Sequence, residues 1–333
     1  MKKVSSKLID KYGRKLNYLR LSITDRCNFR CLYCMPSEGI DKKGHVDVLT
    51  YEELLRISEI AVNMGVEKIR LTGGEPLIRK GIYDFLPRLT ALSGLKDVSV
   101  TTNGMFLKDN IEKIRSAGIN RLNISLDSLK REKFRLITGE DGLKNVWEGI
   151  LAAEKAGFSP IKINTVVIKG VNEDEIPDLA RLSFDHPFHI RFIEYMPMDR
   201  EDMRIPLSHV SNALIKERLS ALGTLQKVKK NSSDGPAERF RFEGAEGEIG
   251  FISALSNHFC ASCNRLRLTA TGHLRPCLLS DIEVDIKGLV RQGASEAELE
   301  GIFLKAASLK PHAHNLISDG LPCLSGKMSS IGG

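Results

Sequence analysis

Three cysteines close together are the residues whose chemistry the sequence indicates most directly. Cys27, Cys31 and Cys34 have the spacing C-x3-C-x2-C and follow an alternating apolar segment, residues 19–23, that predicts a strand. A loop at the end of a strand can direct three thiolates toward one point. A structural zinc ion is normally held by four ligands. Three thiolates suit a four-iron cluster in which one iron stays open for another ligand.

Two other interpretations of this loop stay open on spacing alone. Cysteine is often a small core residue, and the three side chains would then be buried without a ligand. A zinc ion completed by a distant side chain is the second alternative. The spacing also differs from the C-x2-C-x2-C run of bacterial ferredoxins.

A second group of cysteines lies near the other end of the chain. Cys260, Cys263 and Cys277 have the spacing C-x2-C-x13-C. His273 or Cys323 could supply a fourth ligand, and the group would then be a zinc site. The group therefore predicts a metal centre but leaves its metal open.

Two arginines lie within the second cysteine group, between Cys263 and Cys277. Arg265 and Arg267 alternate along a β-like stretch, so their side chains share a face. A solvated strand face is one explanation of this pattern. An anion site is the other, because a guanidinium group binds phosphate through two hydrogen bonds.

Composition limits the class of protein. At ~150 residues per domain, 333 residues predict two domains or one large α/β barrel. A net charge of +7 favours an anionic partner. We expect no nucleic acid partner, because aromatic residues are only 6% and no basic run carries them. No segment is long and apolar enough for a membrane helix or a signal peptide, so we expect a cytoplasmic protein without a membrane partner. Six of the seven cysteines lie in two groups, which does not suit a disulfide framework.

Alternating strand and helix patterns predict the architecture. Strands are expected at 16–23, 67–72, 97–102, 120–125, 160–168 and 188–194. Helices are expected at 51–64, from after Pro76 to about 93, at 109–117, within 130–156 and at 173–184. Such alternation predicts a parallel α/β sheet. Six units are too few for a closed eight-fold barrel, so we expect an open partial (β/α)6 barrel over residues 1–200. Residues 201–333 are expected to form a second domain with helices at 206–222 and near 294–308 and two short β segments around 232–236.

The first cysteine loop resembles the signature of the radical S-adenosylmethionine (radical SAM) enzymes. The aromatic Tyr33 before the last cysteine fits it, and so does Gly73-Gly74-Glu75-Pro76 after a strand. The resemblance implies a 4Fe–4S cluster on Cys27, Cys31 and Cys34, with SAM bound to the open iron. It also implies SAM contacts from Tyr33, Gly74, Ser125 and Met196, while Glu75 is a weaker candidate that could accept from an ammonium group.

Further motifs resemble a narrower family, the GTP 3′,8-cyclases of molybdenum cofactor biosynthesis. These motifs are Cys-x2-Cys-Asn-Arg-x-Arg-Leu-Thr from residue 260, residues 8–14, 24–31 and 191–196, and the ending Ile331-Gly332-Gly333. The resemblance implies a second 4Fe–4S cluster on Cys260, Cys263 and Cys277 that binds guanine, in a C-terminal domain that closes the barrel mouth. The implied GTP contacts are Arg20, Arg70, Thr101, Lys162, Arg265, Leu266 and Arg267, with Lys68, Arg191, Gly332 and Gly333 as weaker candidates.

The same resemblance implies the reaction. An external one-electron donor reduces the first cluster, SAM is cleaved to methionine and a 5′-deoxyadenosyl radical, and this radical takes hydrogen from the ribose 3′ carbon of GTP. The sugar radical then attacks carbon 8 of guanine. Two rival functions stay open, a peptide-modifying radical SAM enzyme with auxiliary clusters and a zinc-holding nucleic-acid-binding module. A homodimer and a monomer are both compatible with the sequence.

Overall fold

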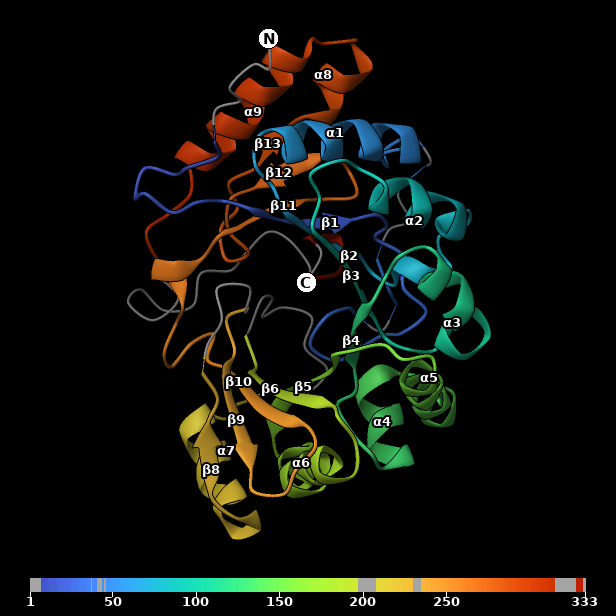
Figure 1. Ribbon diagram of the computed structural model, residues 1–333, viewed down its shortest axis with the longest axis vertical. Helices are drawn as coiled ribbons and strands as arrows, with labels where there is room; N and C mark the ends of the chain where they lie inside the picture. The colour runs from blue at the N-terminus through green and yellow to red at the C-terminus, as the bar shows by residue number, and fades with distance from the viewer. Residues whose placement is uncertain are drawn as a thin grey trace.

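Six parallel strands form the centre of the fold (Figure 1). The computed structural model describes residues 7–36, 38–40, 44, 46–196, 208–229, 235–314 and 328–331. In spatial order the strands are β1 (Tyr18–Ser22), β2 (Lys68–Thr72), β3 (Asp97–Thr102), β4 (Arg121–Ser125), β5 (Ile161–Lys169) and β6 (His189–Glu194). The predicted domain boundary near residue 200, together with Cys323, Gly332 and Gly333, lies outside the described residues.

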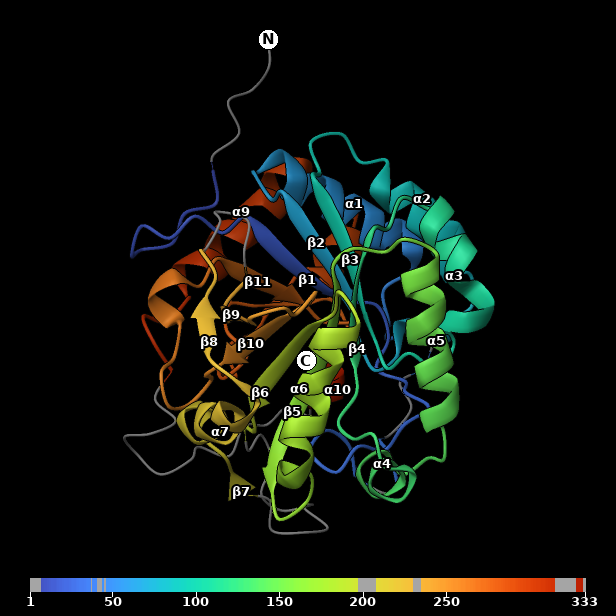
Figure 2. The same cartoon turned by 60° about the horizontal axis from the view of Figure 1, so that its bottom comes forward.

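Helices cover one side of this curved sheet, as Figure 2 shows. They are α1 (Tyr51–Asn63), α2 (Ile82–Thr90), α3 (Leu107–Ser116), α4 (Arg131–Thr138), α5 (Leu143–Lys155) and α6 (Ile176–Asp185). A capping box starts α1, since Thr50 accepts from the Glu53 N–H and Glu53 accepts from the Thr50 N–H. The helical segments predicted within 130–156 are α4 and α5, and α4 ends at Gly139, whose φ is +75°.

The C-terminal region adds strands to both edges of the parallel sheet. Next to β1 lie β11 (Arg265–Leu268), β12 (His273–Arg275) and β13 (Val284–Asp285), while next to β6 lie β10 (Glu248–Ile252), β9 (Glu238–Phe242) and β8 (Leu225–Lys227). Both strands that join an edge, β11 and β10, run parallel to their neighbours. The sequence patterns had predicted β11 and the two strands around 232–236, but not β10.

The remaining elements are short or lie at the periphery. They are β7 (Ser208–His209), which pairs with β5, and the helices α7 (Asn212–Leu219), α8 (Lys287–Arg291), α9 (Glu296–Ser308) and α10 (Met328–Ile331). The helix predicted at 206–222 is thus shorter at its start, where Ser211 caps α7. Among the described helices, none has the length and apolar character needed to cross a membrane.

Alternation along the central strands separates the core from the interior of the barrel. On β1, the side chains of Leu19 and Leu21 are fully buried in the hydrophobic core, whereas Tyr18 and Arg20 line a cavity on the other face of the sheet. Because successive strands repeat this pattern, polar side chains from distant parts of the chain meet inside the barrel.

Glu194 connects the end of β6 to the C-terminal region. Its carboxylate is fully buried and accepts hydrogen bonds from the N–H groups of Asn212, Leu255 and Ser256 at 3.0, 3.0 and 2.9 Å. Burial by itself raises the pKa of this carboxyl, but hydrogen bonds led by those from Ser256 outweigh it and lower the pKa below its ordinary value. The ionised form is therefore the one that the fold stabilises.

We expect Glu194→Gln to lower the free energy of unfolding by about 1.5–3 kcal/mol near neutral pH, the usual net value of a hydrogen bond to a charged group. Urea titration would measure it, with the exposed Glu246→Gln as a control that should change nothing. Because the folded-state pKa is depressed, this stabilisation is present above about pH 4.5 and is lost as the pH falls further. A variant as stable as the wild type at pH 7 would contradict this role.

Candidate active site

One cavity inside the barrel collects most of the predicted site residues. It is lined by Tyr33, Ser125 and Met196 of the predicted SAM site, by Arg20, Arg70, Thr101, Arg191, Arg265 and Arg267 of the predicted GTP site, and by Cys260, Cys263 and Cys277. Both C-terminal segments that join the sheet edges also contribute to its wall, through Ile252 from β10 and Arg265 from β11.

Strand register explains why the arginines meet. Arg20 on β1 lies opposite Arg267 on β11 and opposite Arg70 on β2. On the other half of the sheet, Arg191 on β6 lies opposite Gly250 on β10. A Cβ atom at residue 250 would be 3.1 Å from the Arg191 Cγ, so glycine leaves this side chain room.

These buried cations raise one another's electrostatic energy. Burial, followed by the charge of Arg70, lowers the pKa of Arg191 to about 9, and burial with the charge of Arg265 lowers that of Arg267 to about 10. Within the described chain, neither Arg70 nor Arg191 has a carboxylate at ion-pair distance. The Nε of Arg70 and the Oγ1 of Thr101 are buried and have no hydrogen-bond partner among the described residues. An anion in the cavity would satisfy both requirements.

Lys162 belongs to this cationic region but is not among the residues that line the cavity. It is buried on β5, opposite Asn123 on β4. Burial is the largest cause of its low pKa, about 6, and the charges of Arg191, Arg121 and Arg70 lower it further.

Two other residues predicted to contact GTP do not line the cavity. The side chain of Leu266 lies on the face of β11 opposite to Arg265 and Arg267. It is 1% exposed and packs in the hydrophobic core, so a contact between Leu266 and a ligand in the cavity would come from its backbone. Lys68 is half-buried at the start of β2, opposite Tyr18.

The loop that carries Cys27 lies directly against the Gly-Gly turn. The N–H of Gly74 donates to the Thr24 carbonyl, and that of Glu75 donates to the Arg26 carbonyl, each at 2.8 Å. A Cβ atom at residue 74 would be 2.1 Å from the Arg26 carbonyl oxygen. Gly74 is therefore needed because two backbones approach closely, and the turn fixes the start of the cysteine loop.

The other end of this loop is held by α4. Backbone N–H groups of Arg30 and Leu32 donate to the carbonyls of Thr138 and Ile137 at 2.7 and 2.9 Å. Cys27 and Cys31 lie in the part of the loop that these contacts hold, and Cys34 follows it. All three side chains are half-buried, none forms a disulfide within the described residues, and they lie outside the cavity lining. Burial raises the pKa of the Cys27 thiol to about 11.

Glu75 has a different environment from the one expected. Its side chain is 1% exposed, and it accepts from Leu77 N–H at 3.0 Å, Thr102 hydroxyl at 2.8 Å and Asn103 N–H at 2.6 Å. Burial raises its pKa to about 7 although these bonds favour the ionised form. With its oxygens occupied by the chain, Glu75 joins the ends of β2 and β3.

Tyr33 is positioned by a carboxylate that the motif comparison did not single out. Its hydroxyl donates to Asp127 at 2.6 Å, and Asp127 also accepts from the Val166 N–H at 2.8 Å. Asp127 is two residues after Ser125, so this contact joins the cysteine loop to the end of β4. The polar sequence Ser125-Leu-Asp-Ser at a strand end was the available signal for it.

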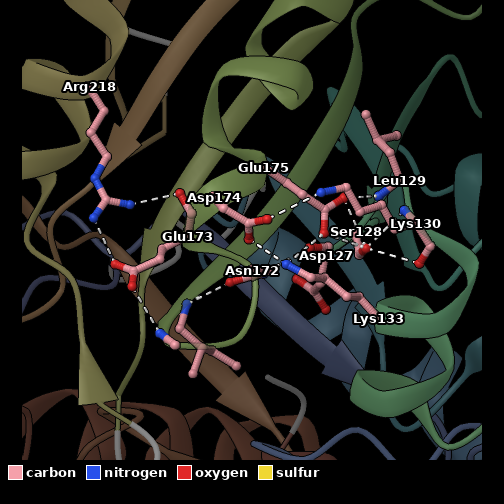
Figure 3. A network of polar contacts seen from close by, with 12 residues as sticks. Asp127, Ser128, Leu129, Lys130, Lys133, Asn172, Glu173, Asp174, Glu175 and Arg218 are labelled. Carbon is pink, nitrogen blue, oxygen red and sulfur yellow. Dashed lines mark hydrogen bonds and ion pairs between the residues drawn. The ribbon is translucent and has the colours of Figure 1, made fainter.

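A polar network supports the same corner (Figure 3). Asn172 donates to the Asp127 carbonyl at 2.8 Å, and the fully buried Glu175 accepts from the Ser128 hydroxyl and the Leu129 N–H, both at 2.8 Å. These contacts fix the segment after β4 against the segment after β5.

The second cysteine group is fixed by two cations at positions to which the sequence analysis gave no role. Buried Lys310 donates to the carbonyls of Arg265 and Pro276 at 2.8 and 2.6 Å. Arg14 donates to the Cys260 carbonyl at 2.7 Å and pairs with Asp10 at 2.6 Å. Arg14 and Asp10 were inside the motif at 8–14, whereas nothing in the local sequence marked Lys310.

The cations also affect the thiols of this group. Burial raises the pKa of Cys263, but the charges of Arg265 and Lys310 outweigh it and bring the pKa down to about 7. Cys260 and Cys277 are half-buried free thiols near it. In the described part of the chain, no three His, Cys, Asp or Glu side chains are arranged around a single metal ion.

Sequence comparisons connect this site to known proteins. Residues 21–183 match the radical SAM superfamily, and residues 188–316 match the family described as Molybdenum Cofactor Synthesis C. A GTP 3′,8-cyclase from Moorella thermoacetica is 48% identical over 307 residues, which cover 92% of this chain and 95% of that protein. One from Geobacter sulfurreducens is 48% identical over 326 residues, which cover 98% and 99%.

Solved structures confirm the predicted fold class. SuiB from Streptococcus suis bound to S-adenosylmethionine aligns with a TM-score of 0.60 at 15% identity, covering 88% of this chain and 69% of SuiB. Native anSMEcpe with bound AdoMet aligns with a TM-score of 0.60 at 15% identity, covering 89% and 81%. The open parallel barrel with a C-terminal extension is thus shared with these proteins.

We expect Gly74→Ala to displace the first cysteine loop, because the new methyl group would overlap the Arg26 carbonyl. Reconstituted protein should then lose about four irons per chain, the content of one cluster, while far-ultraviolet circular dichroism stays close to wild type. Gly301→Ala on α9 is the matched control, since a Cβ there meets nothing within 4 Å. Full iron content in the Gly74 variant would show that the close approach is not required.

Proposed function

The chain belongs to the GTP 3′,8-cyclase family of radical SAM enzymes, and we propose that it cyclises GTP to (8S)-3′,8-cyclo-7,8-dihydroguanosine 5′-triphosphate. In this role it catalyses the first step of molybdopterin, and so of molybdenum cofactor, biosynthesis. The observation that carries the proposal is the group of buried and half-buried arginines, from four separate strands, that faces one cavity together with a cysteine group.

The triphosphate is the part of GTP that the cations recognise. The cavity is lined by five arginines, Arg20, Arg70, Arg191, Arg265 and Arg267. Lys162 is close enough to Arg191 and Arg70 for their charges to lower its pKa. Guanidinium groups bind phosphate oxygens through paired hydrogen bonds. Burial lowers the pKa values of Arg191 and Arg267, and bound phosphate offsets the repulsion from neighbouring arginines that lowers them further. Thr101 offers a hydroxyl to the same ligand. Leu266 contributes through its backbone.

SAM occupies the side of the cavity next to the first cysteine loop. Cys27, Cys31 and Cys34 hold a 4Fe–4S cluster, for which three half-buried cysteines on a loop attached to the Gly-Gly turn and to α4 are a fitting donor set. Tyr33, Ser125 and Met196 line the cavity and contact SAM, and the backbone of Gly74 completes the site. We assign these functions to a domain formed by residues 1–200.

Guanine lies at the opposite side, next to the second cysteine group. Cys260, Cys263 and Cys277 hold a second 4Fe–4S cluster, and the low pKa of Cys263 fits a thiolate ligand. We assign this cluster, the guanine site and the closing of the barrel mouth to residues 201–333. Gly332 and Gly333 are proposed to reach the nucleotide.

The chain contributes position, charge and exclusion of water. A bound, reduced cluster supplies the electron, delivered by an external donor, that cleaves SAM and starts radical chemistry at the ribose 3′ carbon. Arginines that hold the triphosphate and cysteines that place the guanine fix the ribose between them, which brings the two reacting carbons of GTP into a constant orientation. Enclosure by the sheet keeps water away from the radical.

Turnover under anaerobic conditions tests the proposal. Reconstituted protein with GTP, SAM and a chemical reductant should give methionine, 5′-deoxyadenosine and the cyclised nucleotide. With GTP deuterated at the ribose 3′ carbon, the deuterium should appear in 5′-deoxyadenosine. SAM cleavage that needs a peptide instead of GTP would replace this function by peptide modification.

Iron analysis separates the two cysteine groups. We expect Cys31→Ala to remove about four irons and abolish SAM cleavage. Cys277→Ala should also remove about four irons but retain reductant-driven SAM cleavage, while GTP binding is lost. Iron, acid-labile sulfide and nucleotide binding are measured on each variant. SAM cleavage at the wild-type rate in Cys31→Ala, or wild-type GTP affinity in Cys277→Ala, would refute the corresponding assignment.

GTP binding should take up a proton at Lys162. Its pKa is about 6 without ligand, and phosphate oxygens nearby would raise it. Affinity should therefore rise as the pH falls from 8 toward 6, by up to about tenfold per unit, and level off below about 6. Calorimetry in buffers of different ionisation enthalpy measures the uptake.

Two variants isolate the Lys162 contribution from titration of GTP itself. Arginine is always charged, so Lys162→Arg should bind GTP without this proton uptake. Lys162→Met should bind weakly and show only the nucleotide's own pH dependence. If the wild type and Lys162→Arg take up the same number of protons, Lys162 is not the titrating group.

A further inference from the structure

His314 lies in the cavity wall and has no role so far. It lines the same cavity as Cys260 and Cys263, and its main chain hydrogen-bonds to the Cys260 thiol. His258, which also lines the cavity, packs edge-on against it with ring centroids 5.0 Å apart. His314 therefore stands next to the place where we propose that guanine binds.

One hydrogen bond determines which ring nitrogen of His314 carries a proton. The Nε2 atom is 3.0 Å from the carbonyl oxygen of Ala254. A carbonyl oxygen can only accept, so Nε2 must be the donor. In the neutral ring the Nδ1 atom is then an acceptor.

This acceptor has no partner within the described residues. The Nδ1 atom is buried and forms no hydrogen bond there. A buried polar atom left unsatisfied is unfavourable, and such atoms in a cavity wall point to a ligand that supplies the missing group. The missing group must be an N–H or O–H donor.

The segment that carries His314 is held rigidly. Arg14 donates to the carbonyls of Pro311 and His312 at 2.6 and 3.0 Å, and Lys310 is bound to two further carbonyls. With the bond to Ala254, these contacts fix the ring before any ligand arrives. A preorganised acceptor gives more selectivity than one that must be ordered on binding.

We propose that His314 is a specificity-determining residue, whose Nδ1 accepts a hydrogen bond from an N–H group on the guanine base. Guanine offers two such donors, the ring N1–H and the 2-amino group. Hypoxanthine offers N1–H but has no 2-amino group. The inference rests on the proposed function, because it needs GTP in this cavity with the base near the second cysteine group.

Two substitutions separate the acceptor from the structural bond. His314→Gln places an amide N–H where Nε2 stands, which keeps the donor to Ala254 but removes the acceptor. His314→Asn places an amide oxygen where Nδ1 stands, which keeps the acceptor but loses the bond to Ala254. His312→Gln is the matched control, because that ring packs on Tyr12 and does not line the cavity.

Binding is measured on the reconstituted protein without SAM, so that no turnover occurs, with GTP and ITP as ligands. We expect His314→Gln to weaken GTP binding roughly three- to tenfold, the value of one neutral hydrogen bond, at unchanged iron content. His314→Asn should retain more affinity than His314→Gln. An effect on GTP alone assigns the bond to the 2-amino group, and an equal effect on GTP and ITP assigns it to N1–H.

The outcomes distinguish the two levels of the argument. If the wild type does not bind GTP, the proposed function fails and the inference with it. If the wild type binds GTP but His314→Gln binds GTP and ITP as well as the wild type does, only the inference fails. Loss of iron in both His314 variants would assign the residue a structural role and overturn the inference as well.

Discussion

The site depends on the parallel pairing of β1 with β2 on one side and with β11 on the other. This arrangement places Arg20 between Arg70 and Arg267, so that three cations far apart in the sequence are neighbours in the sheet. It also brings the two cysteine groups to one region, because the first follows β1, while the second begins just before β11 and ends just after β12. A shift of β11 by one residue would turn Arg265 and Arg267 into the core and Leu266 into the cavity. The buried side chains of Leu266 and Leu268 therefore specify the register on which the arginines depend.

Burying cations together opposes folding, and the surroundings of each cation show how the chain limits this effect. Arg14 and Lys310 are satisfied by carbonyl oxygens, and Arg14 also by Asp10. These are the cations that fix the second cysteine group. Arg70 and Arg191, which line the cavity, are different. The Nε atom of Arg70 has no hydrogen-bond partner among the described residues, and the pKa of Arg191 is lowered by burial and by neighbouring arginines. The chain thus satisfies Arg14 and Lys310 with its own oxygen atoms, whereas Arg70 and Arg191 remain available to an anionic ligand.

Local patterns were sufficient for the central strands, because each strand from β1 to β6 alternates or follows a clear helix stop such as Gly65. They could not predict β10, since its pairing with β6 is a long-range contact and residues 248–252 are buried with no alternation. In the site, motifs identified many of the residues that line the cavity. The side chains of Leu266 and Glu75 are buried, and the roles that the motifs gave these two residues stay predictions. The motifs did not identify Asp127, Lys310 and His314. The contacts of these residues are with partners that only folding brings near, so neighbouring residues in the sequence gave no signal for them.

In the proposed function, the distribution of charge within the cavity orients the nucleotide. Arg70 and Arg191 lie on the central strands, whereas the second cysteine group and His314 line the cavity from the C-terminal region. The triphosphate of the proposed substrate binds the arginines, and the base of the same molecule points toward the cysteines. The ribose is then held between the two regions, on the side where Tyr33 and Ser125 line the wall. Selecting the ribose carbon that reacts therefore needs no contact to that carbon, because recognition of both ends of GTP already determines its position.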